Sequence, residues 1–338
     1  VWTEPCAQGQ DTNLRKTTER ENVGQFVDGI DRLLISGEAD ITVHSAKDVP
    51  VDSKSGIRAL AYLARGATSD FVLSKEMNGW KNLTKVLQNK SSKRLMDVLE
   101  DLPMKSKVGT VSGRRQSFLL SSRPDIIPIS VRGHIETRLD GLLDGRVSFL
   151  ILAEIGLKRL HESNEISKRH LGLDAIRIRE EDWPTAPGQG AIAVHCRDED
   201  SSLTEKIRTI LNHEPTFNEV ERERGVLKRL GGGCLYPAGV LSMGSLITTA
   251  VSPSDWRSKY ARGETFEIAR YKGDFESFIF EDKSLDKMSE KIERNKPTLI
   301  TTLTSDRIST QLRKKGIPTI DKPVVKLSPL AEAWPRDF

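Results

Sequence analysis

The sequence contains little cysteine and no long apolar run, and each shortage excludes a class of protein. Its 338 residues include three cysteines, Cys6, Cys196 and Cys234, with no CxxC spacing. Three cysteines cannot build a disulfide framework, so we expect a chain that works in a reducing cytoplasm. Apolar runs such as Phe149–Ala153 have strand length, far short of the roughly 18 residues of a membrane span. We therefore expect no membrane contact.

The sequence also has little excess of either charge. Lys and Arg number 52 and Asp and Glu 48, which leaves a net charge of +4. This balance is too small by itself to indicate nucleic acid binding. With 37% hydrophobic and 30% charged residues, the composition is that of a folded chain. The first residue is Val1 rather than Met, and no basic-then-apolar leader follows, so we expect a removed start or an incomplete chain.

What the sequence does contain is an alternation of short strands and amphipathic helices. Apolar residues recur at helical spacing over Phe26–Ile35, and a strand over Asp40–Val43 and the polar turn HSAKDVP follow. Three further units, each a strand followed by a basic helix, begin at Lys107–Thr110, Ile126–Val131 and Phe149–Ala153. This rhythm predicts an α/β fold, in which ligands occupy the crevice outside the carboxyl ends of the strands.

The pattern is weaker elsewhere in the chain. Residues 75–105 are rich in Lys, Asn and Ser, and we expect a helix-bearing surface insertion there. A charged helix is predicted from Glu219 to Leu230, and strand-rich sequence after it. The remaining predicted strands are Ile57–Leu63, Phe71–Leu73, Ala191–His195, Thr298–Thr302 and Val324–Leu327, and the remaining helices are Leu285–Ile292 and Asp306–Lys315.

The segment 105–159 has a larger excess of positive charge than the chain as a whole. It holds ten Lys or Arg against five Asp or Glu. Helix amino termini attract anions, and arginine recognises carboxylate or phosphate in a bidentate manner. Because the charge recurs at three successive strand-to-helix junctions, we expect a cleft for a polyanion. The alternatives are a solvated basic face or a nucleic acid site, although no signature of nucleic acid binding accompanies the charge. The polar residues at these helix starts are Arg114, Arg115, Arg132, Arg138, Thr110 and Ser112.

Asp48 follows Lys47 in the polar turn HSAKDVP. A carboxylate at a strand end among cationic groups stays ionised and can stabilise a developing positive charge. The alternative is an aspartate that only hydrogen-bonds its own turn. His44 could act as a base, but a packed histidine is the preferred interpretation.

Cys234 follows three glycines, which allow a close approach to its sulfur. Lys228 and Arg229 precede it and can lower the pKa of a thiol. The alternative is an inert, small hydrophobic side chain, and this is the interpretation that we favour for Cys196.

Taken together, six segments of the chain resemble the porphobilinogen deaminase family, also called hydroxymethylbilane synthases. They occur in the family's order and span roughly residues 20–290. The segments are ADITVHSAKDVP (39–50), VGTVSGRRQ (108–116), ISVRGHIETRLDGL (129–142), ILAEIGLKRL (151–160), PTAPGQGAIAVHCR (184–197) and ERERGVLKRLGGGCLYP (221–237).

The resemblance implies an enzyme that condenses four porphobilinogens head to tail into hydroxymethylbilane and releases ammonia. It implies a dipyrromethane cofactor, held by a thioether to Cys234, and no metal. Asp48 would be the catalytic carboxylate, assisting loss of ammonia and stabilising the cationic azafulvene and the pyrrole N–H. Cofactor contacts would come from Ser45, Lys47, Thr110, Ser112, Arg114, Arg115 and Gln189, and substrate contacts from Arg132, Arg138 and Arg159.

The implied fold has two periplasmic-binding-protein-like domains and a small α+β third domain. Domain 1 would comprise 1–69 and 184–213, domain 2 residues 70–183, and domain 3 residues 214–292. Residues 297–338 look like the start of a uroporphyrinogen-III synthase, which suggests a bifunctional fusion, and an ordinary extension is the alternative. We expect a cytoplasmic monomer with porphobilinogen as its small-molecule partner.

The sequence departs from the family at its start, where residues 1–25 match no family motif. We expect the family's first strand and helix to be absent. The alternatives to an active enzyme are therefore a non-catalytic anion-binding protein with two domains and an inactive truncated homologue.

Overall fold

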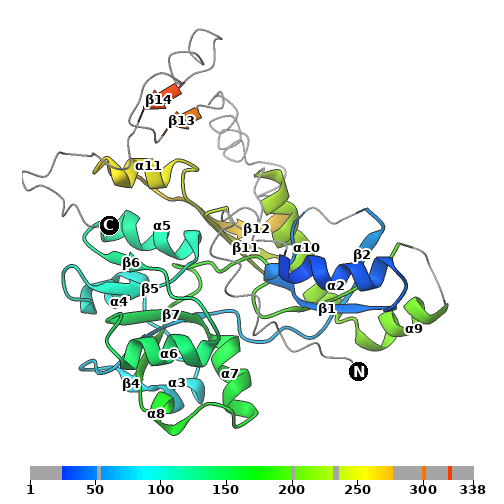
Figure 1. The fold of residues 1–338 in the computed structure, drawn as a ribbon, viewed down its shortest axis with the longest axis horizontal. Helices are drawn as coiled ribbons and strands as arrows, with labels where there is room; N and C mark the ends of the chain where they lie inside the picture. Colours follow the sequence, from blue (N-terminus) through cyan, green and yellow to red (C-terminus); the bar gives the residue numbers. More distant parts are fainter. Residues whose placement is uncertain are drawn as a thin grey trace, which may run out of the picture. The chain divides into compact units, whose positions relative to one another are not determined.

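A computed structural model describes residues 25–51, 55–198, 202–230, 236–276, 299–301 and 319–321. The chain divides into two compact units, residues 1–282 and 283–338. The described part of the first unit holds three β-sheets with helices packed on them (Figure 1). The fold is mixed α/β, as the sequence predicts. No helix among the described residues combines the length and the apolarity needed to cross a membrane.

The first sheet has the strand order β1-β9-β2, and both outer strands run antiparallel to β9. Alternate residues of β1 are buried, because helix α2 covers one face of this sheet with Val27 and Leu34. The polar turn after β1 forms a single 3-10 turn, η2. The bounds are α2 Gln25–Ile35, β1 Thr42–Ser45, η2 Ala46–Asp48, β2 Ile57–Tyr62, β9 Ile192–Arg197 and α9 Ser202–Leu211.

The second sheet has the strand order β4-β8-β3-β7-β5-β6. β5 pairs in parallel with β6 and with β7, so the carboxyl ends of these three strands share one edge. Each leads into a helix, α5, α6 or α7, which confirms the three predicted strand-helix units. The bounds are β3 Asp70–Ser74, β5 Lys107–Gly109, α5 Gly113–Ser122, β6 Ile127–Ile129, α6 Ile135–Leu143, β7 Phe149–Ala153, α7 Glu154–Glu162, α8 Lys168–Leu171 and β8 Asp174–Arg177.

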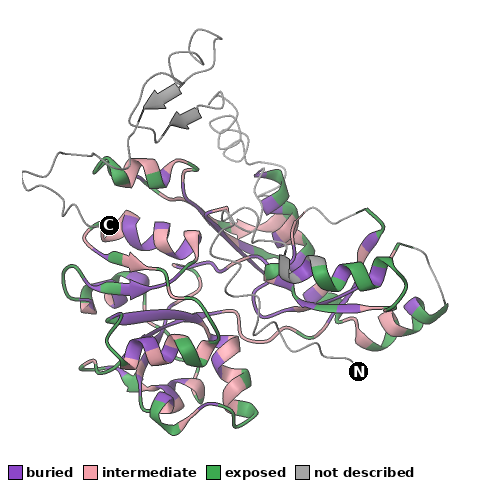
Figure 2. Cartoon of the chain, in the orientation of Figure 1, coloured by how far each residue is buried: buried purple, intermediate pink, exposed green. Residues whose placement is uncertain are grey.

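The structure has helices within residues 75–105, as predicted, but the prediction of a surface insertion there was wrong. The segment supplies edge strand β4 and helices α3 and α4, and most of its apolar side chains belong to the core, although Met96 and Met104 are exposed. Trp80 and Leu99 lie in one hydrophobic cluster with Phe149 of β7. Polar residues outnumber apolar ones in this stretch, but most of the apolar ones are buried. Both helices of the segment therefore carry buried and exposed positions (Figure 2). The bounds are β4 Lys81–Asn82, α3 Leu83–Leu87 and α4 Leu95–Asp101.

The third sheet is an antiparallel meander of β10, β11 and β12. Helix α10 packs on β10 and on β2. It begins at Glu214, earlier than predicted, because Pro215 occupies its first turn and His213 accepts a hydrogen bond from the Thr216 amide. The bounds are α10 Glu214–Arg229, β10 Ala238–Met243, β11 Leu246–Val251, α11 Trp256–Ala261 and β12 Ala269–Asp274.

The described part of the second unit is a parallel pair of strands, β13 Leu299–Thr301 and β14 Thr319–Asp321. β13 confirms the predicted strand over Thr298–Thr302, whereas β14 was not predicted. The predicted helices Leu285–Ile292 and Asp306–Lys315 and the predicted strand Val324–Leu327 lie outside the described residues.

Candidate functional site

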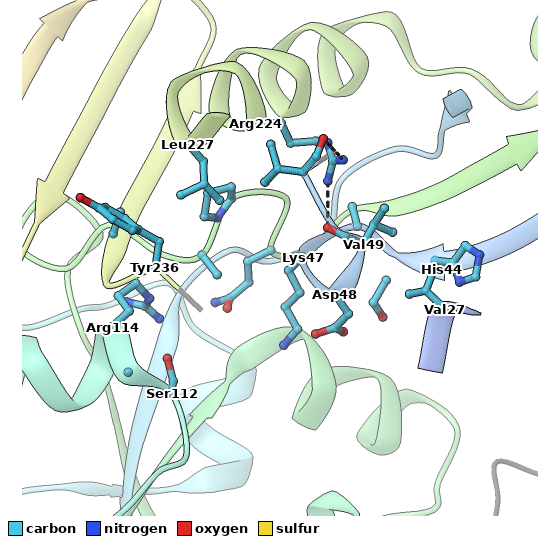
Figure 3. A pocket seen from close by; sticks show the side chains of 18 of the residues that line it. Val27, His44, Lys47, Asp48, Val49, Ser112, Arg114, Arg224, Leu227 and Tyr236 are labelled. Carbon is cyan, nitrogen blue, oxygen red and sulfur yellow. Dashed lines mark hydrogen bonds between the residues drawn. The ribbon is translucent and has the colours of Figure 1, made fainter. Parts of the chain in front are cut away.

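A cavity of about 650 Å³ opens where β1, α5, α10 and the segment before β9 meet. This volume lies within the usual range for sites that take a small molecule. Its wall includes Lys47 and Asp48 from η2, and both side chains point into the cavity (Figure 3). Further lining side chains come from Ser45, Ser112, Arg114, Arg115, Arg138, Gln189, Arg224, Leu227 and Tyr236.

The short turn η2 places the two charged side chains of its loop at the cavity. Ala46 is buried and anchors the turn, while Asp48 is exposed to the cavity and Lys47 is half-buried. Burial lowers the pKa of Lys47, and Arg115 and Arg138 add to the effect, although Asp48 opposes it. A cation that is poorly solvated in this way favours the arrival of an anion.

Arg224 of α10 fixes the backbone that follows Asp48. Its Nη1 donates to the carbonyl oxygen of Val49 at 3.2 Å, and its Nη2 donates to that of Pro50 at 2.7 Å. The position of the Asp48 loop therefore depends on a helix that lies 175 residues further along the chain.

Gly188 allows the crossing segment to pass close to the same loop. Its φ is +76°, and a Cβ there would lie 3.0 Å from the Ala46 Cβ and 3.1 Å from the Lys47 amide nitrogen. Only glycine combines this left-handed backbone with so short an approach. The Gly188 amide also donates to the Glu223 carboxylate of α10 at 2.7 Å.

Asp70, at the start of β3, is the centre of a buried polar network beside the cavity. Its carboxylate accepts hydrogen bonds from Arg114 at 2.7 Å, from Arg115 at 2.7 and 3.0 Å, and from the Trp183 indole and the Gln189 amide at 2.9 Å each. Burial alone would raise the pKa of Asp70, but the charges and hydrogen bonds of the two arginines outweigh it and hold that pKa far below its usual range. Asp70 is therefore ionised and orients both guanidinium groups.

A second cavity of about 230 Å³ adjoins the first and shares Lys47 and Asp48 with it. Arg138 and Arg159, from helices α6 and α7, line this second cavity. The Arg138 Nε donates to the carbonyl oxygen of Gly133 at 2.7 Å, and burial lowers its pKa, as do the charges of Arg115 and Arg132. Cationic groups thus surround Asp48 on the side of the six-stranded sheet.

Comparison with known sequences identifies the family. A family model described as porphobilinogen deaminase, dipyromethane cofactor binding domain, matches residues 5–205. The chain belongs to the porphobilinogen deaminase family. The porphobilinogen deaminase of Thermus thermophilus is 37% identical over 217 residues, which cover 64% of this chain and 63% of that protein. That of Desulforudis audaxviator is 35% identical over 237 residues, 68% of this chain and 67% of that protein.

The chain therefore spans about three fifths to two thirds of the length of the family members that it matches. Among solved structures, an amino acid ABC transporter substrate-binding protein from Streptococcus pneumoniae is 12% identical, with a TM-score of 0.29 over 72% of this chain and 75% of that chain. A TM-score of this size establishes neither a shared fold nor a shared ligand.

Most site residues predicted from the family resemblance meet at these two cavities. Asp48, Ser45, Lys47, Ser112, Arg114, Arg115, Arg138 and Gln189 line the larger one, and Arg159 lines the smaller one. Thr110 and Arg132 do not line either cavity. Thr110 is buried, and its hydroxyl accepts a hydrogen bond from the Ser112 amide at 3.3 Å, whereas Arg132 is exposed. Cys234 lies outside the described residues.

Sequence reasoning missed three contributors to the site: Asp70, Arg224 and Tyr236. Asp70 is an acidic residue at the start of an apolar strand, and this placement is the signal that could have indicated a buried partner for the arginines. Arg224 and Tyr236 lie within the family-like segment 221–237, in which Cys234 carries the clearer chemical signal. Tyr236 lines the cavity, and burial raises the pKa of its hydroxyl.

Proposed function

We propose that the protein condenses four porphobilinogens head to tail into hydroxymethylbilane and releases ammonia. The observation that carries the proposal is the pair Lys47 and Asp48 at the junction of two cavities, with Arg138 and Arg159 nearby. The relatives of about 35% identity bear the name porphobilinogen deaminase, which agrees with this chemistry.

The charges around the cavities suit this substrate. Each porphobilinogen carries an acetate and a propionate, so a growing chain is a small polyanion. Lys47, Arg138 and Arg159 offer positive charge to these carboxylates, and arginine binds a carboxylate through two parallel hydrogen bonds. Several cations spread over two adjoining cavities fit a lengthening product better than one fixed pocket would.

Asp48 would act on the reacting end of the substrate. As ammonia leaves the aminomethyl group, positive charge develops on the carbon and spreads to the pyrrole nitrogen. The Asp48 carboxylate would accept the hydrogen bond of the pyrrole N–H and stabilise this charge. The Arg224 contacts keep the Asp48 loop in place.

The cavity wall also fits a dipyrromethane with its four carboxylates. Arg114 lines the cavity, and its Nε is buried with no hydrogen-bond partner among the described residues. Leu227 and Tyr236, which precede and follow Cys234 in sequence, line the same cavity, which supports attachment through a thioether at Cys234. When bound, the group supplies the pyrrole carbon to which the first substrate is joined. Ser45, Lys47, Ser112, Arg115 and Gln189 would complete the contacts, with Thr110 holding the Ser112 loop.

The finer architecture predicted from the sequence belongs to the same proposal. Two periplasmic-binding-protein-like domains would comprise 1–69 with 184–213, and 70–183, and a third domain would comprise 214–292. The 297–338 segment would begin a uroporphyrinogen-III synthase-like part. Separately, Arg132 would bind substrate carboxylates at the mouth of the cavity. A cytoplasmic monomer is part of this proposal as well.

Measurement of porphobilinogen consumption by the purified protein tests the proposal. We expect Asp48→Asn to lower the rate by at least about 100-fold, because one electrostatic group at a developing charge contributes about that much. Asp40→Asn, at an exposed carboxylate paired with Arg197, is the matched control and should keep the wild-type rate. Thermal unfolding of both variants checks that they fold.

Two outcomes would count against the proposal. If Asp48→Asn consumes porphobilinogen at nearly the wild-type rate, the Asp48 carboxylate does not stabilise the developing charge. If the wild-type protein binds porphobilinogen without consuming it, the alternative of a non-catalytic anion-binding protein is correct. An inactive protein that also fails to bind would indicate an inactive homologue.

A further inference from the structure

Three potential metal ligands meet on the covered face of the first sheet. Asp31 comes from α2, His44 from β1 and His195 from β9, and all three are buried. β1 and β9 are antiparallel neighbours, with Thr42 opposite His195, and α2 packs on both strands. Each ligand therefore comes from a different rigid element, as a preorganised site requires.

The separations within this cluster are close to those of a metal site. One ligand atom from each residue lies within 4.8 Å of the other two. The His44 Nε2 is 3.2 Å from the Asp31 Oδ1, and the two imidazole rings have centroids 5.2 Å apart. Two ligands of a tetrahedral Zn²⁺ lie roughly 3.3 Å apart, given bonds of about 2.0–2.1 Å. The cluster would need to contract by about 1.5 Å at most to reach this geometry.

A second observation also indicates a ligand at this place. The Nδ1 of His195 is buried and has no hydrogen-bond partner among the described residues, and only 5% of the residue is exposed. A buried nitrogen of this kind is costly unless something binds it. Asp31 and His44 satisfy each other, but nothing described in their surroundings satisfies this nitrogen of His195.

We propose that Asp31, His44 and His195 form a binding site for a divalent transition metal such as Zn²⁺. A donor set of two imidazoles and one carboxylate binds zinc and related ions in preference to Mg²⁺ or Ca²⁺. The site is distinct from the proposed catalytic residues, and the resemblance to the family implies no metal. It does not rest on the proposed function.

Metal binding would change the hydrogen bonding of His44. Without metal, its Nε2 lies within hydrogen-bond distance of Asp31 and of the Thr42 hydroxyl, at 3.2 and 3.1 Å. To coordinate through Nε2, the ring takes the tautomer with its proton on Nδ1, with no net proton release. The Thr42 hydroxyl or a water could then serve as the fourth ligand. His44 also lines the larger cavity, which offers an ion a route to the site.

Metal binding would fix the position of β1, the strand that leads to Asp48. His44 is four residues before Asp48, and α2 contributes Asp31 from the opposite side of the metal. Because binding to the folded state stabilises it by mass action, the metal-bound protein should unfold at a higher temperature than the metal-free protein.

A calorimetric titration of the EDTA-treated full chain with Zn²⁺ tests the inference. We expect one equivalent to bind, and affinity to fall at least tenfold in His195→Gln and in Asp31→Asn. His161→Gln, a histidine of α7 outside the cluster, is the matched control and should bind as the wild type does. His195→Gln is the more robust variant, because its Nδ1 has no hydrogen bond to lose among the described residues.

The spectrum of the Co²⁺-substituted protein gives an independent readout. We expect the visible bands of a tetrahedral ion with nitrogen and oxygen ligands, and their loss in His195→Gln. A thiolate charge-transfer band would place the ion on a cysteine instead and overturn the inference. The absence of stoichiometric Zn²⁺ binding, or equal binding by wild type and His195→Gln, would do the same and leave an ordinary buried His44–Asp31 hydrogen bond.

Discussion

Replacement of Asp70 by asparagine should destabilise the protein strongly, although Asp70 is not a proposed catalytic residue. The side chain keeps its shape in Asp70→Asn but loses its charge. Arg114 and Arg115, exposed by only 4% and 8%, would then be buried without the carboxylate that neutralises them. Removing one partner of a buried ion pair costs about 3–5 kcal/mol in free energy of unfolding, and we expect a loss in that range at pH 7.

Urea unfolding followed by tryptophan fluorescence measures this loss. The Trp183 indole donates to Asp70 at 2.9 Å, so its emission reports directly on the network, and linear extrapolation gives the free energy. Asp97→Asn, which breaks the exposed pair with Arg94, is the control and should leave the urea midpoint unchanged. A loss below about 1 kcal/mol in Asp70→Asn would refute the reasoning that the arginines depend on Asp70.

The pH dependence of the free energy of unfolding provides a second test of the Asp70 network. The folded state holds the pKa of Asp70 far below its usual range, whereas an unfolded aspartate titrates near about 3.9. Between these values the unfolded state binds more protons, so stability rises with pH. The difference between wild type and Asp70→Asn should therefore be full at pH 7 and shrink as the pH falls below about 4. A difference that stays constant down to about pH 2 would contradict the assignment.

Three further predictions concern the Asp48 loop. Gly188→Ala should lose more stability than Gly37→Ala, because both positions have a positive φ but only the Cβ at 188 meets neighbouring atoms. We expect the loss in Gly188→Ala to exceed that in Gly37→Ala by about 1–3 kcal/mol in urea unfolding. Equal losses in the two variants would exclude the close approach at Gly188. Arg224→Gln should lower porphobilinogen turnover about tenfold while costing only about 1–2 kcal/mol of stability, and unchanged turnover would show that the loop holds its position without this contact. Lys47→Met should abolish turnover yet leave the urea midpoint equal or higher, because burial penalises the charged lysine; a lower midpoint would contradict this.

The sequence predicted the strand-helix units of the six-stranded sheet because their signals are local. Apolar blocks such as Phe149–Ala153 lie between polar turns, and a helix follows each one. The position of Asp48 at a cavity was also predictable, because a charged turn directly after a strand of an α/β fold lies at the edge where ligands bind.

The roles of Arg114 and Arg115 could not be predicted in full, because their partner is distant in sequence. Asp70 precedes them by more than forty residues, as part of an apolar strand. Taken alone, the two arginines predict a free anion site, whereas the structure pairs both with Asp70. The same limit applies to residues 75–105, where the burial of Trp80 and Leu99 depends on β7, far along the chain.

The intact mass of the protein purified from cells that make porphobilinogen tests the central claim most directly. We predict an increase by the mass of one dipyrromethane, lost in Cys234→Ser and retained in Cys196→Ser, a control at the buried cysteine of β9. Exposure to porphobilinogen should then add further single-substrate increments to the wild type and none to Cys234→Ser. An unmodified Cys234 in the wild type, with no increment after exposure, would contradict both the cofactor attachment and the proposed condensation.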